Sequence, residues 1–584
     1  TTGAPLNGWR RFTPGDIMQE TVTQGINRFI GSVTPSWRPT TWLASRANIG
    51  VDYTGRVDTD LCRRDNCSDF GTSREGFKID NRTNFLTYTL DASAIASFQP
   101  RDWLSTKTTG GVQYFNQQFE RNGASSINLP PGTTTVTAGA TQAADEASTF
   151  SKTLGAFVEQ QLGFRDRLFI TGALRADDNS AFGQNFKAAY YPKVSASWIL
   201  SDETFFPRRQ WLNQLRLRAA YGSSGNRPGS NDALRYFTPR AVSIQDQDTP
   251  GVQFQSLGNP NLKPETSTEF ETGLDAKFFN SRVDLQLTYY NKKTKDALIA
   301  KVLPPSYGSG SGATGTQQFF NIGAVRNNGF EGLISTQLLD RKNLGWDVTL
   351  NGSSNSNKIV ALGAGVPPII LGFLNQDRVG YPANGYWQQP ILSYSDANHD
   401  GFITANELVV GDSFVYRGSA TPKYEAVLTN GFDFFNKRIR IQGLFDYKGG
   451  YLLDNDTERI RCQTRNNCRG LQDPHASLKE QARVVAVRDH ASHTQDGFLE
   501  DASFVRFREL SVTLTASDRI ARMVRANSAS LTLSGRNLHV WTKYTGIDPE
   551  SNYVTGGFTN NDIPSDFQTA PPPSYFVVRL NLGF

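Results

Sequence analysis

Residues 396–407 carry oxygen-bearing groups at the spacing of a calcium-binding loop. Calcium takes six to eight oxygen ligands, which such a loop supplies from positions 1, 3, 5, 7, 9 and 12 around a glycine at position 6. In this chain the six ligand positions are Asp396, Asn398, Asp400, the carbonyl of Phe402, Thr404 and Glu407, and the glycine is Gly401. The pattern predicts a structural calcium site. The alternative is a solvated turn in which Asp and Asn side chains cap backbone amides.

The four cysteines form two close pairs, Cys62 with Cys67 and Cys462 with Cys468. Close pairs in polar segments predict two small disulfides and an oxidising compartment. A zinc site built from all four thiolates is the alternative, although the spacings are longer than those of the usual zinc knuckles.

The remaining motifs give little support for catalysis or cofactor binding. The stretch Gly310 to Gly315 matches a dinucleotide-binding glycine pattern, but it follows no strand and opens no helix. His490 and His493 lie beside Asp489 in a long polar segment, which is weak support for a metal site. No nucleophile motif stands out. We therefore expect a protein that is not an enzyme.

Alternation of apolar and polar residues identifies the elements that must position these groups. In 281–291, Val283, Leu285, Leu287 and Tyr289 share one face, while Asp284, Gln286, Thr288 and Tyr290 share the other. The terminal residues 575–584 alternate in the same way. Aromatic residues make up 11% of the chain, with 52 glycines and only 2 methionines, which favours strands and turns over helices.

About seventeen strands are predicted, and their connections are alternately short and long. The strands are expected near 25–36, 42–54, 84–98, 103–120, 149–162, 166–176, 187–200, 213–221, 266–278, 281–296, 327–339, 344–356, 422–432, 437–447, 499–515, 526–541 and 574–584. The longest connections are 222–265, 357–421 and 448–498. A transmembrane β-barrel has short periplasmic turns and long extracellular loops, whereas a β-sandwich has no reason to maintain this alternation.

Composition excludes several other classes of protein. No run of 18 apolar residues predicts a transmembrane helix, and the first residues form no signal-peptide core. The formal net charge of +5 is small for 584 residues, and no basic cluster indicates a nucleic-acid surface. The fold predicted for residues 1–584 is therefore one all-β, antiparallel transmembrane barrel. The predicted calcium loop 396–407 lies inside its long extracellular loop 357–421.

Several stretches also resemble a known family. They are "LKPETSTEFETGLDAKFFNSRVDLQLTYYNKKTKD", "LRAAYGSSGN", "DANHDGFITANE", "ATPKYEAVLTNGFDF", "FVRFRELSVTL", "GRNLHVWTKYTGIDPE" and "VVRLNLGF". From about residue 8 to the end, the chain resembles SusC/RagA-like TonB-dependent outer-membrane transporters. The resemblance implies a barrel in the outer membrane of a diderm bacterium, a SusD-like surface lipoprotein as a lid, and energy from the TonB complex. It also implies import of oligosaccharides or peptides.

The chain departs from that family in one respect, because no stretch resembles the plug domain or the TonB box. Single-chain barrels have an even number of strands, and plugged transporters have about 22. Seventeen is odd, and two unpaired edges in lipid are costly. We therefore expect the C-terminal part of a larger transporter, completed by a segment that is cleaved, separate or not resolved. A structural or adhesive barrel without import is the alternative function, and a secreted glycan-binding protein is a third.

The sequence does not identify the substrate. Tyr386, Trp387, Trp541 and Tyr544 lie where aromatic rings could stack on sugars. The same residues would equally suit an interfacial belt or packing within the loops.

Overall fold

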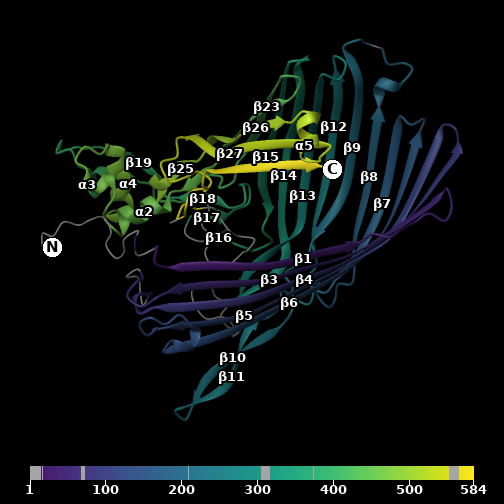
Figure 1. Ribbon diagram of the computed structural model, residues 1–584. Helices are drawn as coiled ribbons and strands as arrows, with labels where there is room; N and C mark the ends of the chain where they lie inside the picture. Colours follow the sequence, from purple (N-terminus) through teal and green to yellow (C-terminus); the bar gives the residue numbers. More distant parts are fainter. Residues whose placement is uncertain are drawn as a thin grey trace. The chain divides into compact units, whose positions relative to one another are not determined.

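The computed structural model describes residues 15, 18–67, 73–207, 209–303, 316–371, 374–551, 565–567 and 569–584. Within these residues the chain is all-β with a few short helices (Figure 1). No helix in the described part of the chain is long and apolar enough to cross a membrane. The glycine-rich stretch 310–315 falls outside the described residues.

One antiparallel sheet contains eighteen described strands. They are β1 (Thr21–Val33), β2 (Ser36–Trp37), β3 (Leu43–Cys62), β4 (Phe77–Arg101), β5 (Leu104–Ile127), β6 (Thr141–Phe164), β7 (Leu168–Asn179), β8 (Ala189–Ile199), β9 (Leu212–Asn226), β12 (Glu265–Phe278), β13 (Val283–Leu303), β14 (Thr316–Arg341), β15 (Leu344–Ala361), β22 (Tyr424–Phe434), β23 (Ile439–Gly449), β26 (Phe504–Thr515), β27 (Ser528–Thr542) and β28 (Tyr575–Gly583).

All seventeen predicted strands are present, and the eighteenth is the two-residue β2. Many strands are longer than predicted, because their polar ends still pair with their neighbours. The prediction of one strand over 499–515 was wrong at its start. Residues Leu499–Asp501 form β25, which pairs with β24 (Leu452–Asp454) outside the main sheet. The chain breaks at Ser503, whose N–H donates to the Asp501 side chain at 2.9 Å.

The chain divides into two compact units, and the first comprises Thr1–Val194, Gly222–Thr266 and Asp296–Asn321. Strands β1, β3, β4, β5, β6 and β7 pair in this order, each antiparallel to the next. One face is apolar and exposed, as at Ile49 and Val57. The other face carries polar pairs, including Arg28 with Asp52 at 2.6 Å.

The second unit comprises Ser195–Tyr221, Ser267–Lys295 and Ile322–Phe584. Strands β14, β15, β22, β23, β26, β27 and β28 pair in this order. Their polar face carries ion pairs, such as Arg440 with Asp347 at 2.8 Å and with Asp433 at 3.0 Å. The alternation predicted from the sequence therefore separates a polar face from an apolar one in both units.

The two strands nearest the ends of the chain each pair on one side within the described residues, β1 with β3 and β28 with β27. Both are almost fully exposed along their length. The expectation of further strands beside them stays a prediction.

The long connections are folded segments rather than irregular loops. They contain the hairpin β10 (Tyr236–Ile244) and β11 (Gln247–Ser256), a four-stranded sheet of β16 (Ile369–Leu371), β17 (Asn375–Asp377), β18 (Gly385–Gln388) and β21 (Val415–Gly418), and the pair β19 (Ile391–Tyr394) and β20 (Leu408–Val410). They also contain helices α2 (Asp456–Gln463), α3 (Arg469–Gln472) and α4 (Leu478–Arg488), whereas α5 (Asp518–Met523) lies in a short connection.

Sequence reasoning missed helix α4, although its signal is visible. Ser477 and Glu480 form a capping box, in which the Glu480 N–H donates to the Ser477 hydroxyl and the Ser477 N–H donates to the Glu480 carboxylate. The following residues include Ala482, Val484, Val485 and Val487, all buried. The sequence interpretation treated 448–498 as one long connection and assigned no helix within it.

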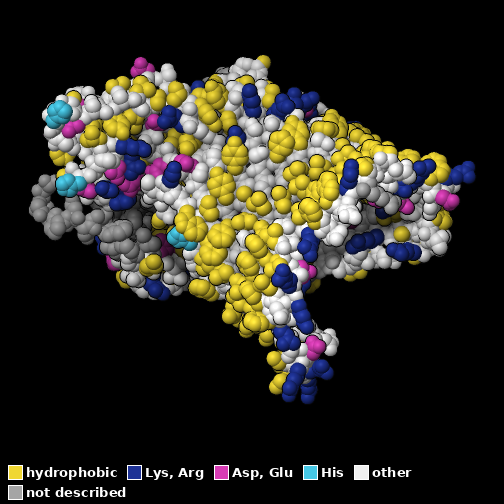
Figure 2. Space-filling view, turned by 90° about the horizontal axis from the view of Figure 1, so that it is seen from above, with side chains coloured by type: hydrophobic (Ala, Val, Ile, Leu, Met, Phe, Trp, Pro, Cys, Tyr) yellow, Lys and Arg dark blue, Asp and Glu magenta, His cyan; other side chains and the backbone are white. Residues whose placement is uncertain are grey.

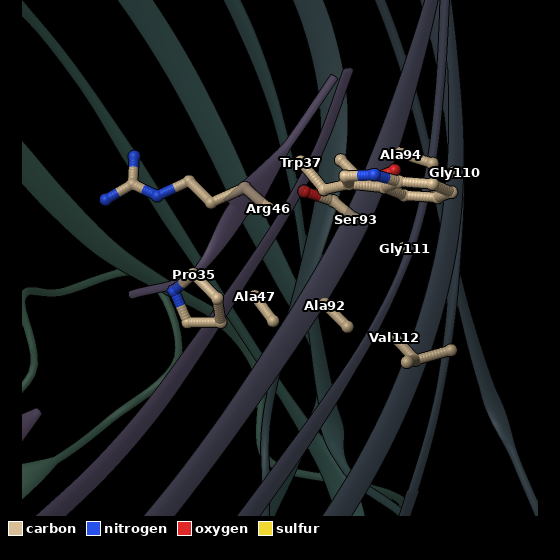
Figure 3. Close-up of a pocket in the computed structure, with 11 residues that line it drawn as sticks. Pro35, Trp37, Arg46, Ala47, Ala92, Ser93, Ala94, Gly110, Gly111 and Val112 are labelled. Atoms are coloured by element: carbon tan, nitrogen blue, oxygen red, sulfur yellow. The ribbon is translucent and has the colours of Figure 1, made fainter. Parts of the chain in front are cut away.

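Hydrophobic side chains cover broad areas of the surface seen in Figure 2. In the first unit, one hollow of about 540 Å³ lies over β2 to β5. Figure 3 shows alanines and glycines there beside Trp37, while Arg46 extends away from the ring. Small residues such as Ala92, Ala94 and Gly110 leave the space. The hollow is a shallow depression in an apolar surface, and few of its side chains could form hydrogen bonds with a solute.

Candidate functional site

The polar face of the second unit contains a pocket of about 470 Å³. Its polar lining comes from β9, β13, β14, β15 and β22: Arg218, Gln286, Thr288, Glu331, Asn351, Ser353 and Glu425. Arg218 is held in place, since it donates to Thr288 at 2.5 Å and to Asp275 at 3.2 Å. Gln286 and Thr288 are on the face that the sequence predicted to be polar.

A second pocket of about 500 Å³ shares Ser353 and Glu425 with the first. It extends along β15 to Asn355 and Asn357 and reaches Asn384 and Lys423 in the connection before β22. Asn355 accepts a hydrogen bond from the Tyr290 hydroxyl at 3.0 Å. Asn357 accepts one from the Ala383 N–H at 2.7 Å, which fixes the connection to the strand.

Asn351 and Ser353 differ from these neighbours. Among the described residues, neither side chain has a hydrogen-bond partner, and both are exposed. A side-chain amide or hydroxyl that has no partner within the protein can donate and accept hydrogen bonds. Such neutral groups can therefore bind a polar, uncharged solute. The sequence predicted a strand over 344–356, but only the structure places these two side chains in a pocket.

The long connections of the second unit pack around helix α4. One side of the helix, with Ala482, Val485 and Ala486, packs on Ile403 and Leu408 from the predicted calcium loop and the strand after it. The other side, with Val484 and Val487, packs on Phe498 and the disulfide between Cys462 and Cys468. Helix α4 therefore joins the connections 362–423 and 450–503 into one assembly.

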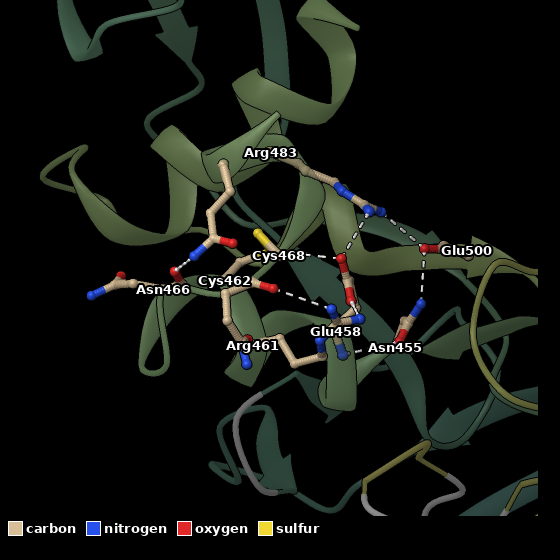
Figure 4. Close-up of a disulfide and its surroundings, with 10 residues drawn as sticks. Asn455, Glu458, Arg461, Cys462, Asn466, Cys468, Arg483 and Glu500 are labelled. Atoms are coloured by element: carbon tan, nitrogen blue, oxygen red, sulfur yellow. Dashed lines mark hydrogen bonds and ion pairs between the residues drawn. A yellow bond between two sulfur atoms is a disulfide. The ribbon is translucent and has the colours of Figure 1, made fainter. Parts of the chain in front are cut away.

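Both predicted disulfides are present in the structure, Cys62 with Cys67 and Cys462 with Cys468. No cysteine is left free for the zinc alternative. Figure 4 shows the second bridge beside Glu458, Arg483 and Glu500. Arg483 lies 3.1 Å from Glu500 and 3.8 Å from Glu458, and these three side chains are largely buried. The ion pairs orient α4 relative to α2 and β25.

A buried ion network attaches the connection after β27 to strand β26. Arg506 donates to both oxygens of Asp548, at 2.6 and 2.8 Å, and the two side chains are 3% and 5% exposed. Glu550 bridges Arg506 at 2.8 Å and Arg508 at 2.9 Å. These residues belong to "FVRFREL" and "GIDPE", which the sequence identified only as family-like stretches.

The predicted calcium residues lie together on one exposed loop, where their carboxylates accept hydrogen bonds from the loop itself. Asp396 accepts from the N–H groups of Asp400 at 3.0 Å and Gly401 at 2.9 Å. Glu407 accepts from the N–H of Ala397 at 2.9 Å and from the hydroxyl and N–H of Thr404 at 2.9 and 3.0 Å. The bonds from Thr404 lower the pKa of Glu407.

The other predicted ligand positions also form hydrogen bonds within the loop. Asn398 donates to Asp400 at 2.8 Å, and Phe402 donates its N–H to Asp400 at 2.8 Å. Gly401 has φ of 85° and open space where a Cβ would stand, so its role is conformational. Among the described residues, the only three His, Cys, Asp or Glu ligand groups within 4.8 Å of one another are Glu458, Cys462 and Cys468. The loop carboxylates therefore do not converge in this conformation.

A buried carboxyl group was not anticipated from the sequence. Asp454, in β24, is 6% exposed, and its Oδ1 atom has no hydrogen-bond partner. Burial and the nearby Asp456 carboxylate hold the pKa of Asp454 well above its usual value. No sequence pattern marked it, because the position is buried only by tertiary packing.

The aromatic residues considered for sugar stacking are mostly core residues. Tyr386, Trp387 and Tyr544 are 0%, 4% and 6% exposed, whereas Trp541 is 49% exposed. The two histidines considered as metal ligands also form hydrogen bonds with nearby residues of the chain. His490 pairs with Ser492 at 2.8 Å, and His493 with the Val487 carbonyl at 3.2 Å.

Comparisons with known proteins agree with this geometry. Residues 2–466 match the family described as "TonB dependent receptor-like, beta-barrel". TonB-dependent receptor P26 of Formosa agariphila is 27% identical over 467 residues, covering 72% of this chain and 45% of its own. The TonB-dependent receptor SusC of Bacteroides thetaiotaomicron is 25% identical over 433 residues, covering 68% and 41%.

The fold comparison agrees. The solved structure of the RagAB peptide transporter aligns with a TM-score of 0.77 at 21% identity, covering 97% of this chain and 62% of that one. An antiparallel sheet with one polar and one apolar face, joined by alternately short and long connections, is typical of transmembrane β-barrel proteins. The chain belongs to the TonB-dependent receptor-like β-barrel family. It spans less than half the length of the curated relatives that it matches.

Proposed function

We propose that this chain forms the barrel portion of an outer-membrane importer that takes up an oligosaccharide or peptide. The observation that carries the proposal is the pair of pockets on the polar face of the second unit, where the free amide and hydroxyl of Asn351 and Ser353 lie beside Arg218 and Glu425. Sugars and peptide backbones both present dense donors and acceptors, which such groups bind.

Family membership and the fold supply the rest of the proposal. SusC and RagAB, which the chain resembles, are named as a TonB-dependent receptor and a peptide transporter. We infer a SusD-like lipoprotein lid over the long connections, and energy from the TonB complex. The assembly around α4 offers a rigid platform for such a lid, because buried cores and a disulfide hold it together.

Purification from the native membrane in detergent tests this proposal, followed by mass spectrometry of co-purifying proteins and bound solute. A surface lipoprotein with an oligosaccharide or peptide is the expected result. The N351A/S353A variant should retain less solute, while S354A/S356A, on the opposite face of β15, should retain the wild-type amount. Purification with no lipoprotein and no solute would favour the structural or adhesive alternative.

We also propose that residues 396–407 bind calcium. The donor oxygens of Asp396, Asn398, Asp400, Thr404, Glu407 and the Phe402 carbonyl match calcium chemistry. Binding requires Glu407 to exchange its bonds to the loop amides for the ion. Gln481 of α4 holds the loop backbone meanwhile, since it accepts from the Ile403 N–H at 2.9 Å and donates to the Gly401 carbonyl at 2.9 Å.

The D396A/D400A variant tests the calcium proposal against D412A, an exposed aspartate of the same connection. We expect calcium binding in isothermal titration for the wild type and D412A only. Proteolysis between 357 and 421 should also increase in D396A/D400A and, for the wild type, in the presence of a chelator. Equal calcium binding by all three proteins would contradict the site.

A further inference from the structure

The short connection between β26 and β27 holds an unusual exposed helix. Helix α5 is fixed to the sheet from beneath, since Ala521 and Ala526 are 1% and 2% exposed. The Asn527 N–H donates to the Gly583 carbonyl at 2.6 Å, and the Thr515 N–H donates to the Arg438 carbonyl at 2.7 Å. The second bond joins this connection to the neighbouring turn 435–438. The backbone of the helix is therefore held firmly while its outer side is free.

The outer side of α5 is apolar where solvent would be expected. Ile520, Met523 and Val524 are 55%, 79% and 52% exposed, and Phe435 of the neighbouring turn is 67% exposed. Single exposed apolar residues are normal, but four on two connected turns mark an interaction surface. Exposed apolar side chains would not stabilise a turn of this length if it faced only water.

Basic side chains accompany these apolar residues. Arg519, Arg522 and Arg525 are exposed on or just after α5, where Asp518 is the one acidic residue of 516–527. The neighbouring turn adds Lys437 and Arg438. Among the described residues, the one carboxylate paired with any of these five is Asp340, 3.4 Å from Lys437. The surface is therefore positively charged and poorly neutralised.

Aromatic pairs indicate what surrounds this end of the strands. In the second unit, Trp211 stacks on Phe278 and Trp346 on Phe432, with centroids 6.0 and 5.7 Å apart, and all four rings lie beside short connections. In the first unit, Trp42 with Phe98 and Trp103 with Phe164 occupy equivalent places in their own strands. Aromatic girdles of this kind lie at membrane interfaces.

We propose that α5, residues 524–525 and the turn 435–438 form a docking surface for the anionic headgroups of phospholipids in the periplasmic leaflet. Arginine guanidinium groups bind phosphate oxygens in a bidentate manner, and flanking apolar side chains enter the boundary between headgroups and acyl chains. The inference rests on the proposed function, because it requires a barrel in the outer membrane with its short connections facing the periplasm.

The test reconstitutes the protein into vesicles of phosphatidylcholine with phosphatidylglycerol and counts retained lipids by native mass spectrometry after extraction. We expect selective retention of phosphatidylglycerol by the wild type. Selectivity should fall about fivefold for each arginine removed in R519Q/R522Q/R525Q, which corresponds to about 1 kcal/mol per charge near an anionic surface. The control R63Q/R64Q/R74Q changes net charge equally in the long connection after β3 and should retain wild-type selectivity.

A fluorophore at M523C gives a second measurement. It should be quenched by brominated acyl chains, whereas a fluorophore at R64C should not. Equal lipid selectivity in the two triple variants, or no quenching at M523C, overturns the inference even if a protein partner binds this surface. Because both outcomes are read from protein inserted in vesicles, they leave the transport proposal standing. Failure of the wild type to insert overturns both.

Discussion

The strands of the sheet and the long connections use hydrophobic side chains in opposite ways. On β6, Leu154 and Val158 are 58% and 52% exposed, whereas in the connection 450–503 Val487 and Phe498 are 0% exposed. Apolar groups in water gather into cores, as the connections do. A sheet that leaves one whole face apolar requires an apolar surrounding. The comparison therefore separates the part of the chain built for lipid from the part built for water.

Breaking the buried ion pair of the connections should have the largest effect. In R506M, Asp548 stays buried without its cation, which costs about 3–5 kcal/mol. Urea unfolding in detergent, with limited proteolysis at 543–551, should show this loss. The control is R28M on β1, which removes the exposed partner of Asp52 and should leave stability close to the wild-type value. An equal loss of unfolding free energy in R506M and R28M would show that the connections do not form a buried core.

A charge on the apolar face of a strand should have the next largest effect. V158R places a guanidinium where lipid is expected and should destabilise the folded protein in vesicles by about 2–4 kcal/mol. E159Q, on the opposite face of β6, should be close to neutral. Folding titrations in lipid vesicles measure both, and a neutral V158R would mean that this face does not meet lipid.

Removing the disulfide of the connections should have a local effect. C462S/C468S opens a short ring, which the chain-entropy model values at about 2 kcal/mol. Protease cleavage within 450–503 should increase, while the strands stay protected. Thiol labelling of the unfolded, non-reduced wild type should find no reactive cysteine, and four reactive thiols would refute both bridges.

The smallest expected effect is a pH dependence of the connections. Because burial raises the pKa of Asp454, its stabilisation is complete below the unfolded value of about 3.9 and is lost as the pH rises through the raised folded value. Within that window, local stability should fall by at most about 1.4 kcal/mol per pH unit. Hydrogen exchange at β24 should show this slope in the wild type and in D412N. A slope that persists in D454N would exclude Asp454 as its source.

The sequence predicted the strands well and the connections poorly, for one reason. A strand with one polar and one apolar face repeats every two residues, so the period alone assigns Gln286 and Thr288 to the polar face, and both line the pocket there. In the connections, Tyr386 and Trp387 looked available for sugars but fill a core, because their burial depends on segments distant in sequence. The buried Asp454 was missed for the same reason, whereas helix α4 had a local capping signal that was overlooked.

By itself the sequence determined the class of fold, the alternation of short and long connections, the two disulfides and the order of potential calcium ligands. These follow from local spacing, since period, turn residues and close cysteines act over a few positions. Only the tertiary structure decided that Arg506 is buried against Asp548, that Asn351 and Ser353 line a pocket, and that α5 presents Met523 and three arginines outward. Such groupings depend on which strands become neighbours, and pairing across a sheet joins residues whose separation in sequence carries no signal.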